Sequence, residues 1–151
     1  MSSRLFVNIR ERQGLAGNIS SALSGYRDAG LLTIYASCVP ERVNELMDAT
    51  IDELRLLKTV PIPSAELRRA KDHLKASLML NLENTSSRMS HLARKEIYQD
   101  FQFELKDTIH NTDQVTTSAV HKVAWDLFRN DTVSATILGE PAGSYSPERR
   151  L

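Results

Sequence analysis

The sequence predicts an α+β fold in which an antiparallel sheet has helices packed on one face. Two observations predict this class. Three short segments have the composition of β-strands, and the first two are close enough in sequence to pair as a hairpin. About six longer segments repeat their apolar residues with the helical period. A two-layer arrangement of helices on a sheet fits this tally best.

The N-terminal residues predict a helix followed by a strand. The helix runs from Ser3 to about Gln13, and Gly14 stands where a helix usually ends. The helix carries three arginines: Arg4, Arg10 and Arg12. From Leu15 to Ser24 the residues alternate with a period of two, which predicts a strand whose second face has only small or polar groups. Such a face beside a cationic helix is suited to binding an extended peptide.

A second strand and a long helix follow. A turn with a glycine at each end precedes the strand predicted at 31–39, which should pair with the first strand as an antiparallel hairpin. Pro40 is typical of a helix start, and apolar residues then follow the helical period as far as Lys58. The adjacent carboxylates Asp52 and Glu53 are expected on the solvated face of this helix.

The rest of the chain is mainly helical. Helices are predicted at 65–82, 87–99, 103–111 and 117–129, and a last strand at 132–138. Either a kink or a loop can separate the first two of these helices. The first helix is expected to turn an apolar stripe toward the core: Leu67, Ala70, Leu74, Leu78 and Leu82.

The predicted sheet is too narrow for the predicted helices. Three strands cannot cover so much apolar helix surface, and an open sheet edge invites pairing with another chain. A chain of 151 residues is expected to form one domain. We therefore interpret residues 1–139 as part of a larger sheet domain, truncated at its start, and residues 140–151 as a polar tail.

Composition excludes several classes of partner. The 19 acidic and 19 basic residues balance, so there is no electrostatic case for a nucleic-acid partner. No apolar run is long enough to predict a membrane span, and no signal peptide is visible. The compartment stays unknown, with the cytoplasm slightly favoured. The single cysteine, Cys38, excludes an internal disulfide and is expected to act as a small buried hydrophobe.

No local motif predicts a cofactor or a catalytic site within the chain. The sequence contains neither H-x-x-E-H nor H-E-x-x-H, and it contains no glycine-rich phosphate loop. The histidines show no metal-ligand spacing: His73, His91, His110 and His121. We expect no zinc site wholly within this chain.

Three stretches carry a resemblance to a known family. These are S-S-R-L-F-x-x-I-R-E-x-x-G-L-A at the start, G-Y-R-D-A-G-L-L-T-I-Y-A after the small polar strand, and E-N-T-S-S-R-M-S-H-L-A-R-K-E at 83–96. From Ser2 to about Gly139 the chain resembles the second half-domain of the pitrilysin/insulinase-type zinc metallopeptidases, which include mitochondrial processing peptidase. In that family the zinc and the general base lie on the other half, in an H-x-x-E-H motif.

The resemblance also implies a binding site. In the family, this half supplies an arginine and, seven residues later, a tyrosine that together hold the substrate carbonyl. The arginine position falls on Arg10 and the tyrosine position falls on Gly17. The chain therefore keeps the cation and lacks the phenol, and losing one hydrogen-bond donor to a developing oxyanion typically costs about a hundredfold in rate. By strand parity, neither Asn18 nor Tyr26 replaces that donor.

Two functions follow as expectations. In the first, the chain is the substrate-binding half of a zinc-dependent metalloendopeptidase, with Arg10 and the strand Leu15 to Ser24 contacting the peptide. Its partner would be a zinc-bearing half-domain or chain of the same family, and a dimer is possible. In the second, the chain is a non-catalytic scaffold that closes the peptide chamber or stabilises a catalytic partner. Alone, the chain is expected to have no peptidase activity and to bind no stoichiometric zinc.

Overall fold

The computed structural model describes residues 3–99 and 105–140. It confirms an α+β fold with predominantly helical content and one two-stranded antiparallel sheet. The chain divides into two compact units. The first comprises the residues up to Val60 together with those from Lys122 onward, and the second comprises Pro61–His121.

The first unit opens with a helix that leads into a β-hairpin. Helix η1 (Leu5–Arg12) is a π-helix, and Gly14, at φ 59°, adopts the left-handed conformation that commonly ends a helix. Strands β1 (Asn18–Gly25) and β2 (Gly30–Ser37) pair antiparallel, in a register that runs from Asn18 opposite Ser37 to Gly25 opposite Gly30. The hairpin predicted from the sequence is confirmed, although β1 begins three residues later than expected.

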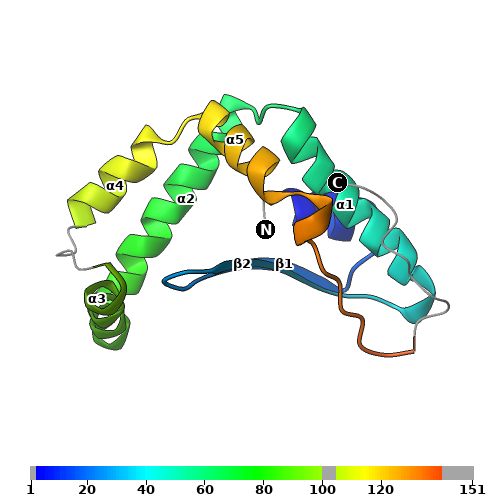
Figure 1. Ribbon diagram of the computed structural model, residues 1–151, viewed down its shortest axis with the longest axis horizontal. Coiled ribbons are helices and arrows are strands. Elements are labelled where there is room, and N and C mark those ends of the chain that lie inside the picture. Colours follow the sequence, from blue (N-terminus) through cyan, green and yellow to red (C-terminus); the bar gives the residue numbers. More distant parts are fainter. Residues whose placement is uncertain (1–2, 100–104, 141–151) are drawn as a thin grey trace. The chain divides into compact units, whose positions relative to one another are not determined.

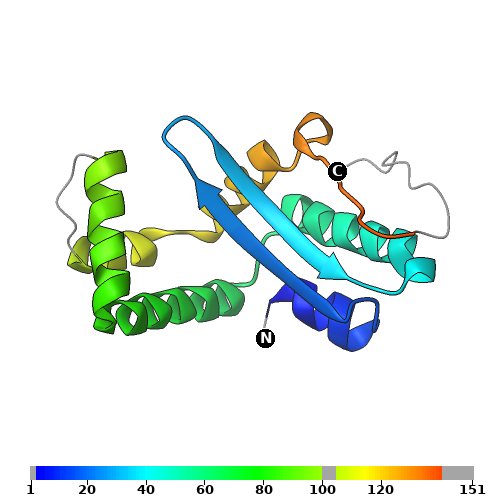
Figure 2. The same ribbon diagram turned by 90° about the horizontal axis from the view of Figure 1, so that it is seen from below.

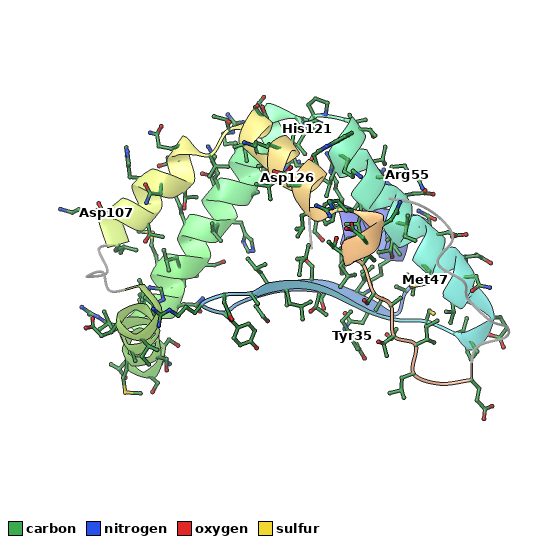
Figure 3. All side chains as sticks on the ribbon, viewed as in Figure 1. Tyr35, Met47, Arg55, Asp107, His121 and Asp126 are labelled. Carbon is green, nitrogen blue, oxygen red and sulfur yellow. The ribbon has the colours of Figure 1, made fainter. Side chains whose placement is uncertain are left out.

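One long helix lies beside one end of this hairpin. After a single turn of 3₁₀-helix, η2 (Pro40–Arg42), helix α1 (Val43–Thr59) lies on one side of the hairpin, at the end where β1 begins and β2 ends (Figures 1 and 2). A buried cluster joins η1, the start of β1 and α1: Ile9, Leu15, Ala16, Ile19 and Leu46. From β2, Ile34 and Ala36 pack against this cluster, as the two-residue period of the strand requires. Tyr35 projects from the opposite face of the sheet (Figure 3).

The C-terminal part of the first unit contributes few buried side chains. Helix α5 (Thr117–Leu127) begins in the second unit and ends in the first, where Ala124 and Phe128 are buried. A 3₁₀ turn, η3 (Asn130–Thr132), follows it. The strand predicted at 132–138 is wrong, because no strand among the described residues pairs with this segment and Leu138 is fully exposed. The predicted tail lies almost wholly outside the described residues, and the boundary at residue 139 stays a prediction.

The second unit consists of helices. Helix α2 (Ser64–Glu83) is followed directly by α3 (Thr85–Gln99), and α4 (Leu105–Gln114) comes next. Between α2 and α3 only Asn84 leaves the helical conformation, with φ −78° and ψ 122°. Its side-chain oxygen accepts a hydrogen bond of 3.1 Å from the Ser87 amide and so caps α3. The junction is therefore a break of one residue, shorter than a loop.

The apolar stripe of α2 is only partly covered. Leu67, Leu78 and Leu82 are half-buried, whereas Ala70 and Leu74 are exposed. The prediction that the whole stripe faces a core is therefore wrong for the residues that the structure describes. A helix needs a second layer to bury such a stripe, and the described part of the chain supplies that layer only in part.

A salt bridge joins α2 to α4, and it predicts a pH-dependent stability. The Lys75 ammonium lies 2.7 Å from a carboxylate oxygen of Asp113, and Lys71 donates to the Asp113 carbonyl oxygen at 2.8 Å. The hydrogen bond from Lys75 holds the pKa of Asp113 below its ordinary value of 3.8. A carboxylate with a lowered pKa stabilises the fold above its ordinary pKa and loses that effect as the pH falls through the folded value.

We therefore expect Asp113→Asn to lower the melting temperature slightly at pH 7. The difference from the wild type should shrink on acidification and vanish once Asp113 of the wild type is protonated. Thermal unfolding followed by circular dichroism between pH 7 and pH 2 measures this. Glu83→Gln, which removes an exposed carboxylate of α2, serves as the control. A difference that is independent of pH would contradict the assignment.

No helix in the described part of the chain is long and apolar enough to cross a membrane.

Candidate functional site

The structure places Arg10 on the exposed side of η1. Its guanidinium carbon lies 4.8 Å from the centroid of the Phe6 ring, four residues earlier, in a cation–π contact. Arg10 itself is exposed, whereas Phe6 is half-buried. The ring therefore supports the side chain while its charge stays accessible to a ligand.

Arg10 directly follows the best-buried residue of the unit. Ile9 has no exposed surface, and its carbonyl oxygen accepts a 3.0 Å hydrogen bond from the amide of Leu15. At the start of the helix, the Val7 amide bonds instead to the oxygen of Ser3, four residues back. The bond to Leu15 closes the turn at Gly14 that follows η1. Because Ile9 is fixed in the core, the direction of Arg10 depends on the π register of η1.

A polar network connects η1 to α1. The Asn8 amide nitrogen donates to Oε1 of Glu53 at 2.8 Å, and the Asn8 amide oxygen accepts from Arg12 at 3.1 Å. Glu53 is only 8% exposed, so the prediction that it lies on the solvated face of α1 is wrong. Among the described residues, no group hydrogen-bonds to its second oxygen, Oε2.

The sequence held a signal for the burial of Glu53. It stands seven residues after Leu46 and four before Leu57, so the helical period places it on the same face as these leucines. Adjacent residues of a helix point in different directions. The prediction that Asp52 and Glu53 share the solvated face overlooked this. Asn8 gave no comparable signal, since its partner lies 45 residues away in the sequence.

Gly17 lies between η1 and the first residue of β1. It is exposed, and its amide donates to the Ser37 carbonyl oxygen at 2.8 Å. A Cβ atom at this position would lie 3.7 Å from the Ser37 hydroxyl oxygen and 3.8 Å from the Ser37 carbonyl oxygen, both ordinary contacts. Its φ lies outside the left-handed region that strains other residues. The backbone at residue 17 therefore accepts a Cβ atom without rearrangement.

The tyrosines nearest to Gly17 in the sequence stand at other positions of the hairpin. Tyr26 stands at the turn, at the far end of β1, where its amide bonds to the Ala29 carbonyl oxygen at 2.8 Å. Tyr35 pairs in register with Ser20. The small residues predicted to face a ligand along β1 are exposed: Asn18, Ser20, Ala22 and Ser24. Leu15 and Ala16 are both buried, and every residue of β1 after Ile19 is exposed, so the alternation of buried and exposed residues predicted for 15–24 is wrong.

The other candidate residues lie outside η1, the helix that carries Arg10. Cys38 packs against the core cluster, and burial raises the pKa of its thiol above the ordinary 9.0 while the charge of Arg42 opposes the rise. The histidines lie on four different helices: His73 on α2, His91 on α3, His110 on α4 and His121 on α5. Within residues 3–99 and 105–140, no group of three or more His, Cys, Asp or Glu side chains is placed to hold a metal ion. The His, Cys, Asp and Glu side chains of the described ranges therefore do not fit a zinc centre.

Comparison with known proteins identifies the family. Residues 1–74 match the family described as the peptidase M16 inactive domain. An uncharacterized zinc protease of Mycobacterium tuberculosis is 40% identical over 144 residues, which cover 95% of this chain and 32% of that protein. The zinc protease YmxG of Bacillus subtilis is 37% identical over 95% of this chain and 35% of its own length. The chain thus spans about a third of the length of these relatives.

Solved structures agree with this result. A protease from Helicobacter pylori matches with a TM-score of 0.71 and 25% identity, over 83% of this chain and 30% of its own. A chain of complex III2 from Candida albicans matches in fold with a TM-score of 0.76 at 20% identity, over 85% of this chain and 31% of its own. The protein therefore belongs to the M16 peptidase family, of the pitrilysin/insulinase type, and corresponds to part of its inactive second half-domain.

Proposed function

We propose that this chain is the substrate-binding half of a zinc-dependent metalloendopeptidase. In this proposal Arg10 binds the carbonyl oxygen of the scissile peptide bond, and the segment from Leu15 to Ser24 lies along the extended substrate. The partner is a zinc-bearing half-domain or chain of the same family, since the described residues of this chain offer no metal site. When bound by that partner, zinc would supply Lewis-acid polarisation and an activated water.

The observation that carries the proposal is the placement of Arg10. A guanidinium that is exposed, supported by Phe6 and held on a helix packed into the core is a fixed hydrogen-bond donor for a carbonyl oxygen. It stands on the element that leads directly into β1.

The strand beside Arg10 also favours an extended ligand. The sheet contains only β1 and β2 within the described residues, so the outer edge of β1 carries main-chain groups that no strand there pairs with. Extended peptides bind such edges through main-chain hydrogen bonds, while side chains of alternating direction add specificity. Small side chains on the exposed face of β1 leave room for those of a substrate.

Arg10→Ala tests the proposal in an enzyme reconstituted with an intact zinc-bearing half. A hydrogen bond from a charged donor contributes about 1.5–3 kcal/mol, so we expect kcat/KM for peptide hydrolysis to fall about tenfold or more. Arg27→Ala is the matched control, because Arg27 is an exposed arginine of the same unit in the turn at the far end of β1. Equal activities of the Arg10 variant and the wild type would refute the proposed role.

A second candidate function is a non-catalytic scaffold that closes the peptide chamber or stabilises a catalytic partner. The observation that favours it is Gly17 in the position of the family's tyrosine, because glycine offers no hydroxyl to a developing oxyanion. Under this alternative a zinc-bearing partner would bind the chain without depending on Arg10 for turnover. Gly17→Tyr separates the two functions, because only the substrate-binding half has a turnover that an added hydroxyl can raise.

A further inference from the structure

The conformation of η1 needs an explanation beyond local sequence. A π-helix of eight residues is unusual, since π geometry occurs mostly as single turns within α-helices and often at functional sites. Nothing in the segment forbids the ordinary α-helix, because it contains neither proline nor glycine between Leu5 and Arg12. Contacts from outside the helix must therefore select the wider register.

The contacts from outside include the apolar packing of Leu5 and Ile9 and the hydrogen bond from Asn8 to Glu53. Ile9 supplies apolar contact, which is non-directional and tolerates small rotations. The 2.8 Å hydrogen bond from the Asn8 amide to Glu53 is directional, and its acceptor is a carboxylate that is nine-tenths buried. Because burying an unpaired carboxylate is costly, Glu53 strongly favours the backbone register that brings Asn8 to it.

This register also sets the direction of Arg10. Successive residues of an α-helix are turned by about 100° around its axis, so a change in the number of residues per turn redirects every later side chain. Arg10 is two residues beyond Asn8, and its contact with the Phe6 ring joins residues on consecutive turns. If η1 relaxed to α geometry while Ile9 stayed buried, the guanidinium would leave its present position.

We propose that Asn8 and Glu53 are positioning residues: their hydrogen bond holds η1 in the π register and thereby directs Arg10 toward the substrate carbonyl. This inference rests on the proposed function for the substrate-binding role of Arg10. The claim about the register of η1 is independent of it. Asn8 and Glu53 touch neither substrate nor metal in this scheme.

The first experiment measures the register in the chain alone. Nuclear magnetic resonance of the wild type should show the short-range contacts of a π-helix across Leu5–Arg12. In Asn8→Ala we expect contacts typical of an α-helix across the same residues. Arg12→Ala removes the weaker 3.1 Å bond to Asn8 and serves as the control, which should keep the π register. An unchanged register in Asn8→Ala overturns the inference.

The second experiment measures kcat/KM in the enzyme reconstituted with a zinc-bearing half. Asn8→Ala and Glu53→Met, which removes the acceptor at similar volume, should each lower kcat/KM about tenfold to a hundredfold, as small misplacements of a binding group do. Glu53→Gln keeps an oxygen at this position that accepts from Asn8 and should retain activity near that of the wild type. A role in stability alone predicts that all three variants have the kcat/KM of the wild type at temperatures where they are folded.

A double-mutant cycle distinguishes the two proposals. If Asn8 acts through Arg10, the variant carrying both Asn8→Ala and Arg10→Ala should be no less active than Arg10→Ala alone. Full additivity would overturn the positioning role while leaving the role of Arg10 intact. If Arg10→Ala has no effect, the proposed function fails, and the resonance experiment still decides whether Asn8 and Glu53 hold the register.

Discussion

Replacing Gly17 with tyrosine should raise the turnover of the reconstituted enzyme about a hundredfold. The tyrosine hydroxyl would add a second donor beside Arg10 for the oxyanion that forms on the substrate carbonyl, and one such donor is typically worth two orders of magnitude or more in kcat. The backbone accepts the change, since a Cβ at residue 17 would meet only Ser37 atoms at 3.7 and 3.8 Å. Steady-state hydrolysis of a fluorogenic peptide measures the effect.

Gly17→Phe is the matched control for this prediction. It adds the same ring without the hydroxyl, so any change in folding or partner binding caused by the ring appears in both variants. If the hydroxyl acts on the oxyanion, only the tyrosine variant gains turnover. A scaffold would gain turnover in neither variant, and equal gains in both would contradict a role for the hydroxyl.

Replacing Ile9 with alanine should destabilise the first unit by about 2–5 kcal/mol, the usual range for truncating a buried isoleucine. Ile9 is completely buried and joins η1 to β1 and α1, so a cavity there affects all three elements. Domains of this size are stable by only about 5–15 kcal/mol. Unfolding in urea, monitored by circular dichroism, should show a lower midpoint for the transition of this unit.

The control for the Ile9 prediction is Leu23→Ala. Leu23 is an apolar residue of β1 with 78% of its surface exposed, and its truncation should change the free energy of unfolding by no more than about 0.5 kcal/mol. Similar losses in the two variants would show that the cluster around Ile9 is not the main source of stability in this unit.

Local patterns were sufficient to predict most of the elements. The helical period of the apolar residues from Val43 to Leu57 predicts which face of α1 is buried, and the two-residue period of β2 does the same for that strand. The structure confirms both predictions. The segment at 132–138 is a case in which the local pattern predicted the wrong structure. Its composition suits a strand, yet a strand forms only beside another strand, and the described residues offer none there.

The site was predictable only in part, for a similar reason. The resemblance to a known family is what assigns the proposed substrate contact to Arg10, and no local pattern separates it from Arg4 or Arg12. The π register of η1 was not predictable from local sequence, and the hydrogen bond that we propose to hold it joins residues 45 positions apart. Periodicity reports which face of an element is buried and does not distinguish α from π geometry.

The one-residue break at Asn84 has a consequence for the architecture of the second unit. Asn84 alone separates the two helices, and its side chain caps α3, so the hydrogen bonds at the change of direction join residues within four positions of each other. The hydrogen bonds of this corner are therefore local in sequence, whereas the apolar stripe of α2 needs a second layer to be buried.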